Sequence, residues 1–409
     1  MRLPAKDVKI KYVDEGQQFG KPPLRELHHI ALSIVSGRDG VLNGSYTPQS
    51  WEECGEVVVA HFKKAEDDFA QLEEALKRPY DQYPYAWNDG IEMNYPHLVK
   101  VKQFTQSAAM RSTAFSAMAR SSASFRDAQL AISLIHTGDS DLAMSRLVQM
   151  AQAGNALNTL RAAQQFHVWN DEQWSEVQAQ LREMDFPGLI PASIRVDAIM
   201  MRIEILKMQK SIALIMAEYP FLGAMALPGL QAMFGKWQRL LLIAYFDMIS
   251  EIETALEKSR TQPWRDCNVG PLPRSLEDYE YGHFGFLVPD GDKTFQRALN
   301  VQTYIELAEV ACALERYCLA NQQYPETLEE LVPDYLDASP RDPMTHEPWH
   351  YRRDEDRGFR LYTVGKNGRD DGGEFEQRSN VNVKDDILWS VEAVAPKLPK
   401  IAQPSRRPD

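Results

Sequence analysis

The spacing of apolar residues predicts that most of this chain is α-helical. From Thr47 to Leu76, apolar side chains recur every three or four residues, acids and lysines fill the other positions, and Pro79 ends the pattern. This spacing places one series of residues on a common helix face: Val58, Phe62, Ala65, Phe69, Leu72 and Leu76. We expect that face to be buried.

The region 101–260 continues as helix. It is rich in Ala, Leu, Met, Gln and Arg, which favour helices, and only short polar breaks interrupt it. After one such break, Asn170 is expected to cap a helix, with Gln173 at the reciprocal position of a capping box. Because short breaks favour antiparallel neighbours, the sequence predicts a multi-helix antiparallel bundle of helical hairpins.

The most apolar stretch runs from Ser211 to Phe234. Glu218, Pro220 and Pro228 interrupt it, whereas a membrane-spanning helix needs about 20 consecutive apolar residues. We therefore expect a buried helical hairpin here and no membrane span in this chain. A segment lying at a membrane interface is the alternative.

The pattern changes near residue 294. A last long helix is expected over 294–320, because Tyr304, Leu307, Ala311, Leu314 and Cys318 form one apolar stripe. Turn residues and short alternating segments follow over 325–390. Two of these segments, 349–351 and 359–362, have the pattern of a β-hairpin.

Changes in composition divide the chain into five segments, with the main boundary at a stretch rich in Pro and Gly. We expect an irregular N-terminal arm (1–46), a helical domain (47–260), a linker (261–293), an α+β domain (294–393) and a disordered tail (394–409). The expected fold class is mainly α: a multi-helix antiparallel bundle, then a small α+β domain made of a long helix and a short antiparallel sheet.

Composition and charge exclude some classes of partner. The 409 residues contain 45 Lys and Arg against 58 Asp and Glu, a formal net charge of -13. An acidic surface repels phosphate backbones and anionic lipid headgroups, so we expect neither nucleic acid nor a bare membrane as the main partner. The four cysteines form no CxxC pair, which argues against a zinc site or a disulfide framework and favours small core residues.

Catalytic signatures are missing from the sequence. It contains no HExxH motif, no glycine-rich phosphate loop and no nucleophile elbow. The acidic pairs Glu52-Glu53, Asp67-Asp68 and Glu73-Glu74 are expected on the solvent face of a helix. The sequence therefore favours a protein that is not an enzyme.

A series of short motifs gives the C-terminal quarter a recognisable order. They are Tyr324-Pro325, Leu331-Val332-Pro333, Pro340-Arg341-Asp342-Pro343, Gly365-Lys366-Asn367-Gly368, Asp371-Gly372-Gly373 and Asp385-Asp386. In this order they resemble the globular domain of the major pseudopilins of type II secretion systems, as also found at the C-terminus of large helical proteins of planctomycete-type bacteria. The resemblance implies a helix cradling a small sheet. It does not imply a filament subunit, because unrelated sequence stands where a pseudopilin has its polymerising helix.

The same resemblance implies a calcium site in the glycine-rich loop. The residues it points to are the carbonyl of Val364 and the side chains of Asn367, Asp385 and Asp386, with Asp370 and Asp371 nearby. This sequence departs from the pattern in two ways: Asn367 stands where an aspartate is usual, and residues 374–384 form an insertion. The alternative is a solvated Asp/Gly turn whose acids accept hydrogen bonds from backbone amides.

The favoured function is that of a non-enzymatic scaffold or interaction protein. Its expected location is periplasmic or envelope-associated, and its expected partners are proteins or envelope components. One alternative is an extracytoplasmic hydrolase that acts through carboxylates of the helical domain. Another is a peptide- or substrate-binding helical module with exposed aromatic anchors at Phe166, Trp169, Trp174 and Trp237. The charged N-terminal start predicts no secretion signal within this sequence.

Overall fold

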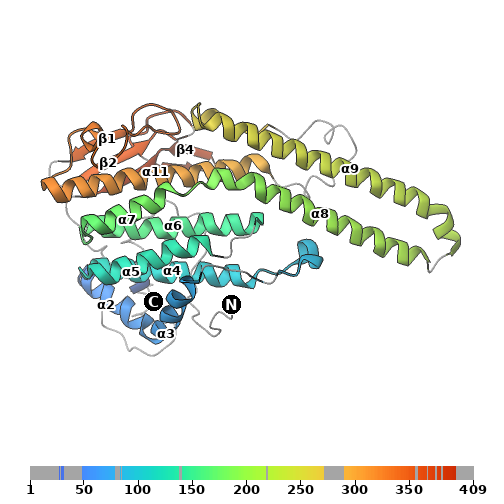
Figure 1. Cartoon of the computed structure of the whole chain (residues 1–409), viewed down its shortest axis with the longest axis horizontal. Coiled ribbons are helices and arrows are strands. Elements are labelled where there is room, and N and C mark those ends of the chain that lie inside the picture. Colours follow the sequence, from blue (N-terminus) through green and yellow to red (C-terminus); the bar gives the residue numbers. More distant parts are fainter. Residues whose placement is uncertain are drawn as a thin grey trace, which may run out of the picture.

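The computed structural model describes residues 48–78, 85–137, 141–217, 220–270, 290–354, 358–365, 367–373, 375–378 and 381–392, together with Leu27, residues 29–31 and Tyr83. The described part is mainly α-helical and carries a small antiparallel sheet, as the sequence predicts (Figure 1). Most of the predicted arm, residues 271–289 of the predicted linker and the predicted tail lie outside the described residues.

The first helical segment is a pair of short helices. Helices α2 (Trp51–Phe62) and α3 (Glu66–Leu76) are joined by one turn of 3₁₀ helix, Lys63–Ala65. Ser50 begins α2, because its hydroxyl accepts a 3.1 Å hydrogen bond from the backbone N–H of Glu53. The predicted apolar face is confirmed: it is buried as far as Leu72, and Leu76 is partly buried.

Four further helices form the bundle next to this pair. They are α4 (Pro96–Ala117), α5 (Ser121–Ser133), α6 (Ala143–Gln165) and α7 (Asp171–Arg182). Helix α4 lies at the centre and packs against α2, α5 and α6. The predicted capping box is present at the start of α7: Asn170 and Gln173 exchange two hydrogen bonds of 2.9 Å between side chain and backbone.

Helices α8 (Phe186–Ala217) and α9 (Pro220–Ser259) form a long hairpin that extends beyond the rest of the described chain (Figure 1). Its base is buried against the bundle, for example at Ile194 and Ile252. The expected burial of the stretch that begins at Ser211 is wrong for Leu214, which is 62% exposed. The reason is the length of the hairpin, because this part of α8 lies past the end of the bundle. In the described ranges, no helix combines the length and the apolar character that crossing a membrane requires.

The last helix, α11 (Gly291–Asn321), is the long helix expected over 294–320. Asp290 caps it by accepting a 3.0 Å hydrogen bond from the N–H of Lys293, and Gln322 ends it in a left-handed conformation. The predicted apolar stripe is confirmed, since Leu307, Ala311, Leu314 and Cys318 are buried and Tyr304 is partly buried. A 3₁₀ turn, Leu328–Leu331, follows the helix.

The sheet has the antiparallel order β1 (His350–Asp354), β2 (Gly358–Thr363), β5 (Ile387–Val391). Phe359 lies opposite Val391 and Leu361 lies opposite Trp389, and all four side chains are buried on the face that packs against α11. Strands β3 (Phe375–Arg378) and β4 (Val381–Asp385) form a separate two-stranded ribbon in the segment that the sequence marks as an insertion.

Helix α11 joins the sheet to the bundle. It packs against α6, α7 and α8 on one side and against β2 and β5 on another, so the buried side chains of both regions belong to one apolar cluster. The cysteines are part of this interior: Cys54, Cys267, Cys312 and Cys318 are all buried, and none of them forms a disulfide bond. Their predicted role as small core residues is confirmed.

Candidate functional site

The predicted calcium loop is the turn that leaves β2. Gly372 and Gly373 have φ of 73° and 77°, a backbone conformation that L side chains rarely adopt. A Cβ on Gly373 would also lie 3.1 Å from Leu388 Cδ1 of β5. The turn therefore needs glycine at this point in order to fold back against the sheet.

Asp386 is the centre of this turn. Its side chain is 2% exposed, and its Oδ2 accepts hydrogen bonds from the backbone N–H groups of Asp371 (2.8 Å) and Gly373 (2.9 Å). Its Oδ1 is buried and has no hydrogen-bond partner in the described part of the chain. Burial raises the pKa of this carboxyl above its ordinary value, because the charged form loses water.

The other predicted ligands make contacts within the turn. Asp370 Oδ1 accepts hydrogen bonds from the N–H of Gly372 and the hydroxyl of Tyr362, and Asn367 Nδ2 donates to Asp371 Oδ2 at 3.0 Å. The structure thus brings Asn367, Asp370, Asp371 and Asp386 into one turn, next to the buried Val364. Asp385 is the last residue of β4, and its side chain lies outside the described residues.

These contacts leave both interpretations of the turn open. Among the described residues, no three His, Cys, Asp or Glu side chains are grouped so that they could hold a metal ion. Most of the oxygens already accept hydrogen bonds from the turn, which is the arrangement of an Asp/Gly turn. The buried Oδ1 of Asp386 is the one feature that fits a cation. Calcium binding here stays a prediction.

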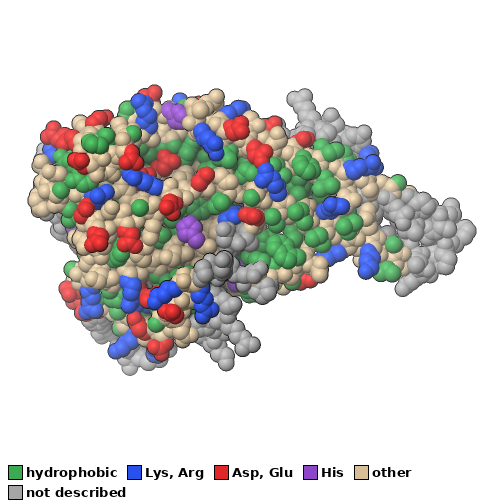
Figure 2. All heavy atoms as spheres, viewed as in Figure 1, with side chains coloured by type: hydrophobic (Ala, Val, Ile, Leu, Met, Phe, Trp, Pro, Cys, Tyr) green, Lys and Arg blue, Asp and Glu red, His purple; other side chains and the backbone are tan. Residues whose placement is uncertain are grey.

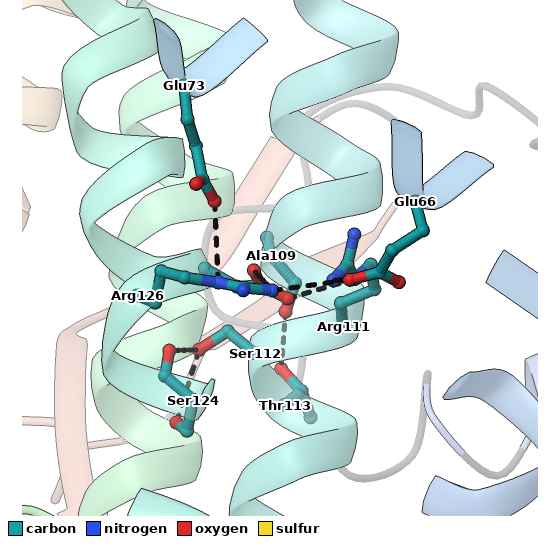
Figure 3. Close-up of polar contacts among 9 residues, drawn as sticks. Glu66, Glu73, Ala109, Arg111, Ser112, Thr113, Ser124 and Arg126 are labelled. Atoms are coloured by element: carbon teal, nitrogen blue, oxygen red, sulfur yellow. Dashed lines mark hydrogen bonds and ion pairs between the residues drawn. The ribbon is translucent and has the colours of Figure 1, made fainter. Parts of the chain in front are cut away.

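A second polar cluster was not expected from the sequence (Figure 3). Arg111 on α4 and Asp127 on α5 form an ion pair with an Nε–Oδ2 distance of 3.0 Å, and their side chains are 1% and 0% exposed. The Arg111 guanidinium also lies over the ring of Phe69 on α3, 4.0 Å from its centroid. At the rim, Arg126 lies 3.3 Å from Glu73.

Burial controls the charge of this cluster. It raises the pKa of Asp127 to about 6, although Arg111 and Arg126 both favour the charged form. Arg126 is about half exposed and Glu66 more so, and they cover the buried pair from the α3 side (Figure 3). Asp127 therefore has no access to a substrate, and the cluster serves to join α3, α4 and α5.

Two further acids lie on α11: Glu315 is buried and Glu306 is partly buried. The hydroxyl of Tyr324 donates a hydrogen bond to Glu315 Oε1, and His167 Nδ1 lies 3.3 Å from Glu315 Oε2. This carboxylate therefore ties α11 to the connection between α6 and α7 and to the segment after α11. Burial, together with repulsion from Glu309 and Asp342, raises the pKa of Glu306 to about 8. The surroundings of Glu306 therefore favour its protonated form.

The sequence carried one signal for the buried pair. Arg111 is the only charged residue between Lys102 and Arg120, in a helix of small and apolar residues. An isolated charge in such a segment cannot lie on a charged solvent face, so it indicates a buried partner. Which acid pairs with it depends on the packing of α4 against α5 and cannot be read from spacing.

The predicted aromatic anchors are mostly core residues. Trp169 and Trp174 are buried and pack against each other with ring centroids 4.6 Å apart, so their assignment as exposed anchors is wrong. Both follow the break between α6 and α7, where the chain turns back over the bundle and covers them. Phe166 is half-buried, and the side chain of Trp237 lies outside the described residues.

Exposed apolar side chains gather instead on the α8–α9 hairpin. Of the ten large hydrophobic residues that are exposed in the described ranges, six lie on these two helices. We call this set the hairpin face: Ile199, Leu206, Met208, Leu214, Ile243 and Phe246. Figure 2 shows hydrophobic side chains gathered where Figure 1 places α8 and α9, with Lys and Arg side chains beside them.

A small apolar cavity lies between α5, α6, α7 and α11 and is too small for an organic ligand. That cavity has a volume of about 10 Å³ and is lined by residues such as Ile132, Leu157 and Ile305. It could hold about one water molecule, whereas sites for small organic molecules measure roughly 300 Å³ or more. The hairpin face is therefore the better candidate for a functional surface.

Comparison of the chain with protein-family models, with curated proteins and with solved structures gives no match. The pseudopilin resemblance of the C-terminal region accordingly stays a prediction, and the candidate site is argued from the geometry alone.

Proposed function

We propose that this protein is a non-enzymatic scaffold or interaction protein of the cell envelope, and that it docks through the hairpin face. The observation that carries the proposal is the position of the exposed apolar residues. Six of the ten share the two helices that extend past the bundle, while the bundle helices α4 and α6 expose one each, Val99 and Met144.

The physical argument rests on what solvent-facing helices normally carry. The outer face of a helix on a soluble protein is polar, and neighbouring exposed apolar residues on a projecting element are typical of interaction surfaces. Phe246 is 69% exposed, and full burial of a side chain of this size is worth about 1.5–3 kcal/mol. Contact with a partner therefore gains free energy that folding of this chain leaves unused.

The buried acids support a non-catalytic role. Asp127 and Glu315 are closed off from solvent, and both carboxylates are held by partners from other segments of the chain. The hydrolase alternative is favoured by one observation, the raised pKa of Glu306 near Asp342, because a protonated carboxyl beside a second acid can act as a general acid. Glu306 lies on α11, outside the helical region where that alternative expected its carboxylates.

The test of the docking role uses the full chain in the cell that makes it. We expect the wild-type chain to be recovered in a particle or sedimentable fraction larger than the monomer, and the double variant Leu206→Glu/Phe246→Glu to shift to the monomer fraction. Val99→Glu on α4 is the matched control, since Val99 is also exposed but lies off the hairpin. Recovery of the wild-type chain as a free monomer contradicts the proposal.

Calcium binding at the glycine-rich turn is a second candidate function. It is supported by the buried Oδ1 of Asp386, whose partner in the described part of the chain is missing. If calcium binds, the buried Oδ1 of Asp386 is the described side-chain atom that would hold it. The ion would then stiffen the neighbouring ends of β2 and β5 without taking part in any reaction.

A further inference from the structure

Basic residues outnumber acids in the part of the hairpin that lies farthest from the bundle, and the acids Glu204 and Asp247 stand just outside it. Between Ile205 and Phe246 the sequence contains four basic residues, Lys207, Lys210, Lys236 and Arg239, and a single acid, Glu218. The whole chain has the opposite balance, with a formal net charge of -13. The hairpin is thus a local basic and apolar element on an acidic protein.

We propose that the hairpin face docks on the surface of a lipid bilayer that contains anionic headgroups. This inference rests on the proposed docking function and names the partner for the same surface. Basic side chains bind the headgroups, while the exposed apolar side chains enter the boundary between headgroups and acyl chains, as in interfacial amphipathic helices.

The spacing of the exposed residues supports this combination. Arg202, Leu206, Lys210 and Leu214 are exposed and four residues apart, so they follow one face of α8. On α9, Arg239, Ile243 and Phe246 are exposed at spacings of four and three. Each large apolar side chain in these two series therefore has a basic residue within one or two helical turns of it.

The depth of contact is that of an interface rather than a span. Helix α8 continues for seven residues beyond Lys210, to Ala217, which corresponds to about 10 Å at the usual helical rise. The sequence between Lys210 and Lys236 carries only one charge, at Glu218. An apolar end of this length, followed by basic residues, suits shallow insertion with the lysines reaching up to the headgroups.

Charge complementarity favours lipid over a second copy of the chain. Two hairpin faces in contact would bring like charges together, and lysine or arginine pairs across an interface are repulsive. The acidic bundle does not prevent docking, because the hairpin extends away from it (Figure 1) and charges are screened beyond roughly 8 Å at physiological ionic strength.

Vesicle flotation with the purified full chain tests the inference. We expect the protein to float with vesicles of phosphatidylcholine and phosphatidylglycerol, to stay behind with vesicles of phosphatidylcholine alone, and to dissociate as salt is raised. The charge variant Lys210→Glu/Arg239→Glu should bind at least about tenfold more weakly. Each basic residue near an anionic surface contributes about 1 kcal/mol to binding, and about 1.4 kcal/mol corresponds to a tenfold change in affinity.

The apolar variant Leu214→Ser/Phe246→Ser should lose binding to a similar extent. Lys64→Glu and Val99→Ser are the matched controls, because both residues are exposed on helices outside the hairpin, and they should bind as the wild type does. Circular dichroism of each variant shows that it is folded.

The inference is overturned if the folded wild-type chain fails to float with anionic vesicles, or if the hairpin variants float as the controls do. Light scattering on the same samples measures the molar mass. A wild-type dimer that becomes a monomer in the hairpin variants would assign the surface to contact with a second copy of the chain. If the cell-extract experiment still shows a hairpin-dependent particle while flotation fails, docking stands and its partner is a protein.

Discussion

The side-chain amide of Gln164 connects the bundle to the sheet by bonding to Trp389. Gln164 Oε1 on α6 accepts a 2.6 Å hydrogen bond from Trp389 Nε1 on β5, and Gln164 Nε2 donates to the carbonyl of Ala311 on α11 at 2.8 Å. Both Gln164 and Trp389 are fully buried. The bundle, α11 and the sheet therefore share a polar contact inside their common core, and we expect them to unfold together.

Replacing Gln164 should reveal this coupling. Gln164→Leu leaves the indole N–H of Trp389 buried without a partner, which costs about 1–3 kcal/mol of unfolding free energy. Urea unfolding followed by tryptophan fluorescence and far-UV circular dichroism measures the loss. Gln165→Leu is the control, because Gln165 bonds to the backbone of Glu392 at the surface and should lose less than about 1 kcal/mol. Equal losses in the two variants contradict the coupling.

The buried pair of Arg111 and Asp127 makes a sharper prediction. Arg111→Met leaves a carboxylate buried without its cation, and we expect a loss of about 3–5 kcal/mol in unfolding free energy. Arg126→Met is the control within the same cluster, since Arg126 is about half exposed and its ion pairs are worth about 0–1 kcal/mol.

The double variant Arg111→Met/Asp127→Leu separates the pair from its packing. If the loss in Arg111→Met comes from the stranded charge, removing the acid as well should recover most of the stability. Failure to recover would mean that the contact of Arg111 with Phe69 dominates instead. The same urea titration measures all three variants.

Local patterns in the sequence predicted local structure well. The Asn170–Gln173 capping box, the buried stripe of α11 and the β1–β2 hairpin all depend on residues that are near one another in the chain. Such features follow from helix and strand periodicity and from the hydrogen-bonding needs of helix ends. The mainly α fold with a small sheet follows from the same signals.

Features set by contacts between distant elements were beyond sequence reasoning. Leu214 lies in an apolar stretch of the sequence, which favours burial. Only the packing of whole helices shows that this part of α8 extends past the end of the bundle. Trp169, in the break before α7, and Trp174, in the first turn of α7, were candidate anchors, but the fold covers both. The acids of the glycine-rich turn do lie together, but their spacing does not tell whether amides or a cation satisfy them.

Glu306 predicts an unusual dependence of stability on pH. Its folded pKa of about 8 lies above the ordinary value of 4.5, so the native state holds the proton more tightly than the unfolded state. This contribution to stability is complete below pH 4.5 and is lost as pH rises through 8, at about 1.4 kcal/mol per pKa unit. Glu306→Gln should remove this loss. In melting experiments, the stability of the variant relative to the wild type should therefore be higher at pH 9 than at pH 4.

The control for this prediction is Glu329→Gln, because Glu329 is exposed in the turn after α11 and should leave the pH profile unchanged. A Glu306→Gln profile that runs parallel to the wild type from pH 4 to pH 9 contradicts the assignment.

Asp386 allows the calcium hypothesis to be tested independently of folding. If calcium completes the turn, millimolar calcium should raise the melting temperature of the wild type, and a concentration of 100 times the Kd corresponds to about 2.7 kcal/mol of stabilisation. Asp386→Asn keeps an oxygen that can accept the N–H groups of Asp371 and Gly373 but lacks the charge, so it should stay folded and lose the response to calcium. Asp337→Asn, at a position that is almost fully exposed, should respond as the wild type does. A wild-type melting curve that is the same in calcium and in chelator would show that backbone amides alone hold the turn, and the remaining role of Asp386 would be to hold the glycine-rich turn against the start of β5.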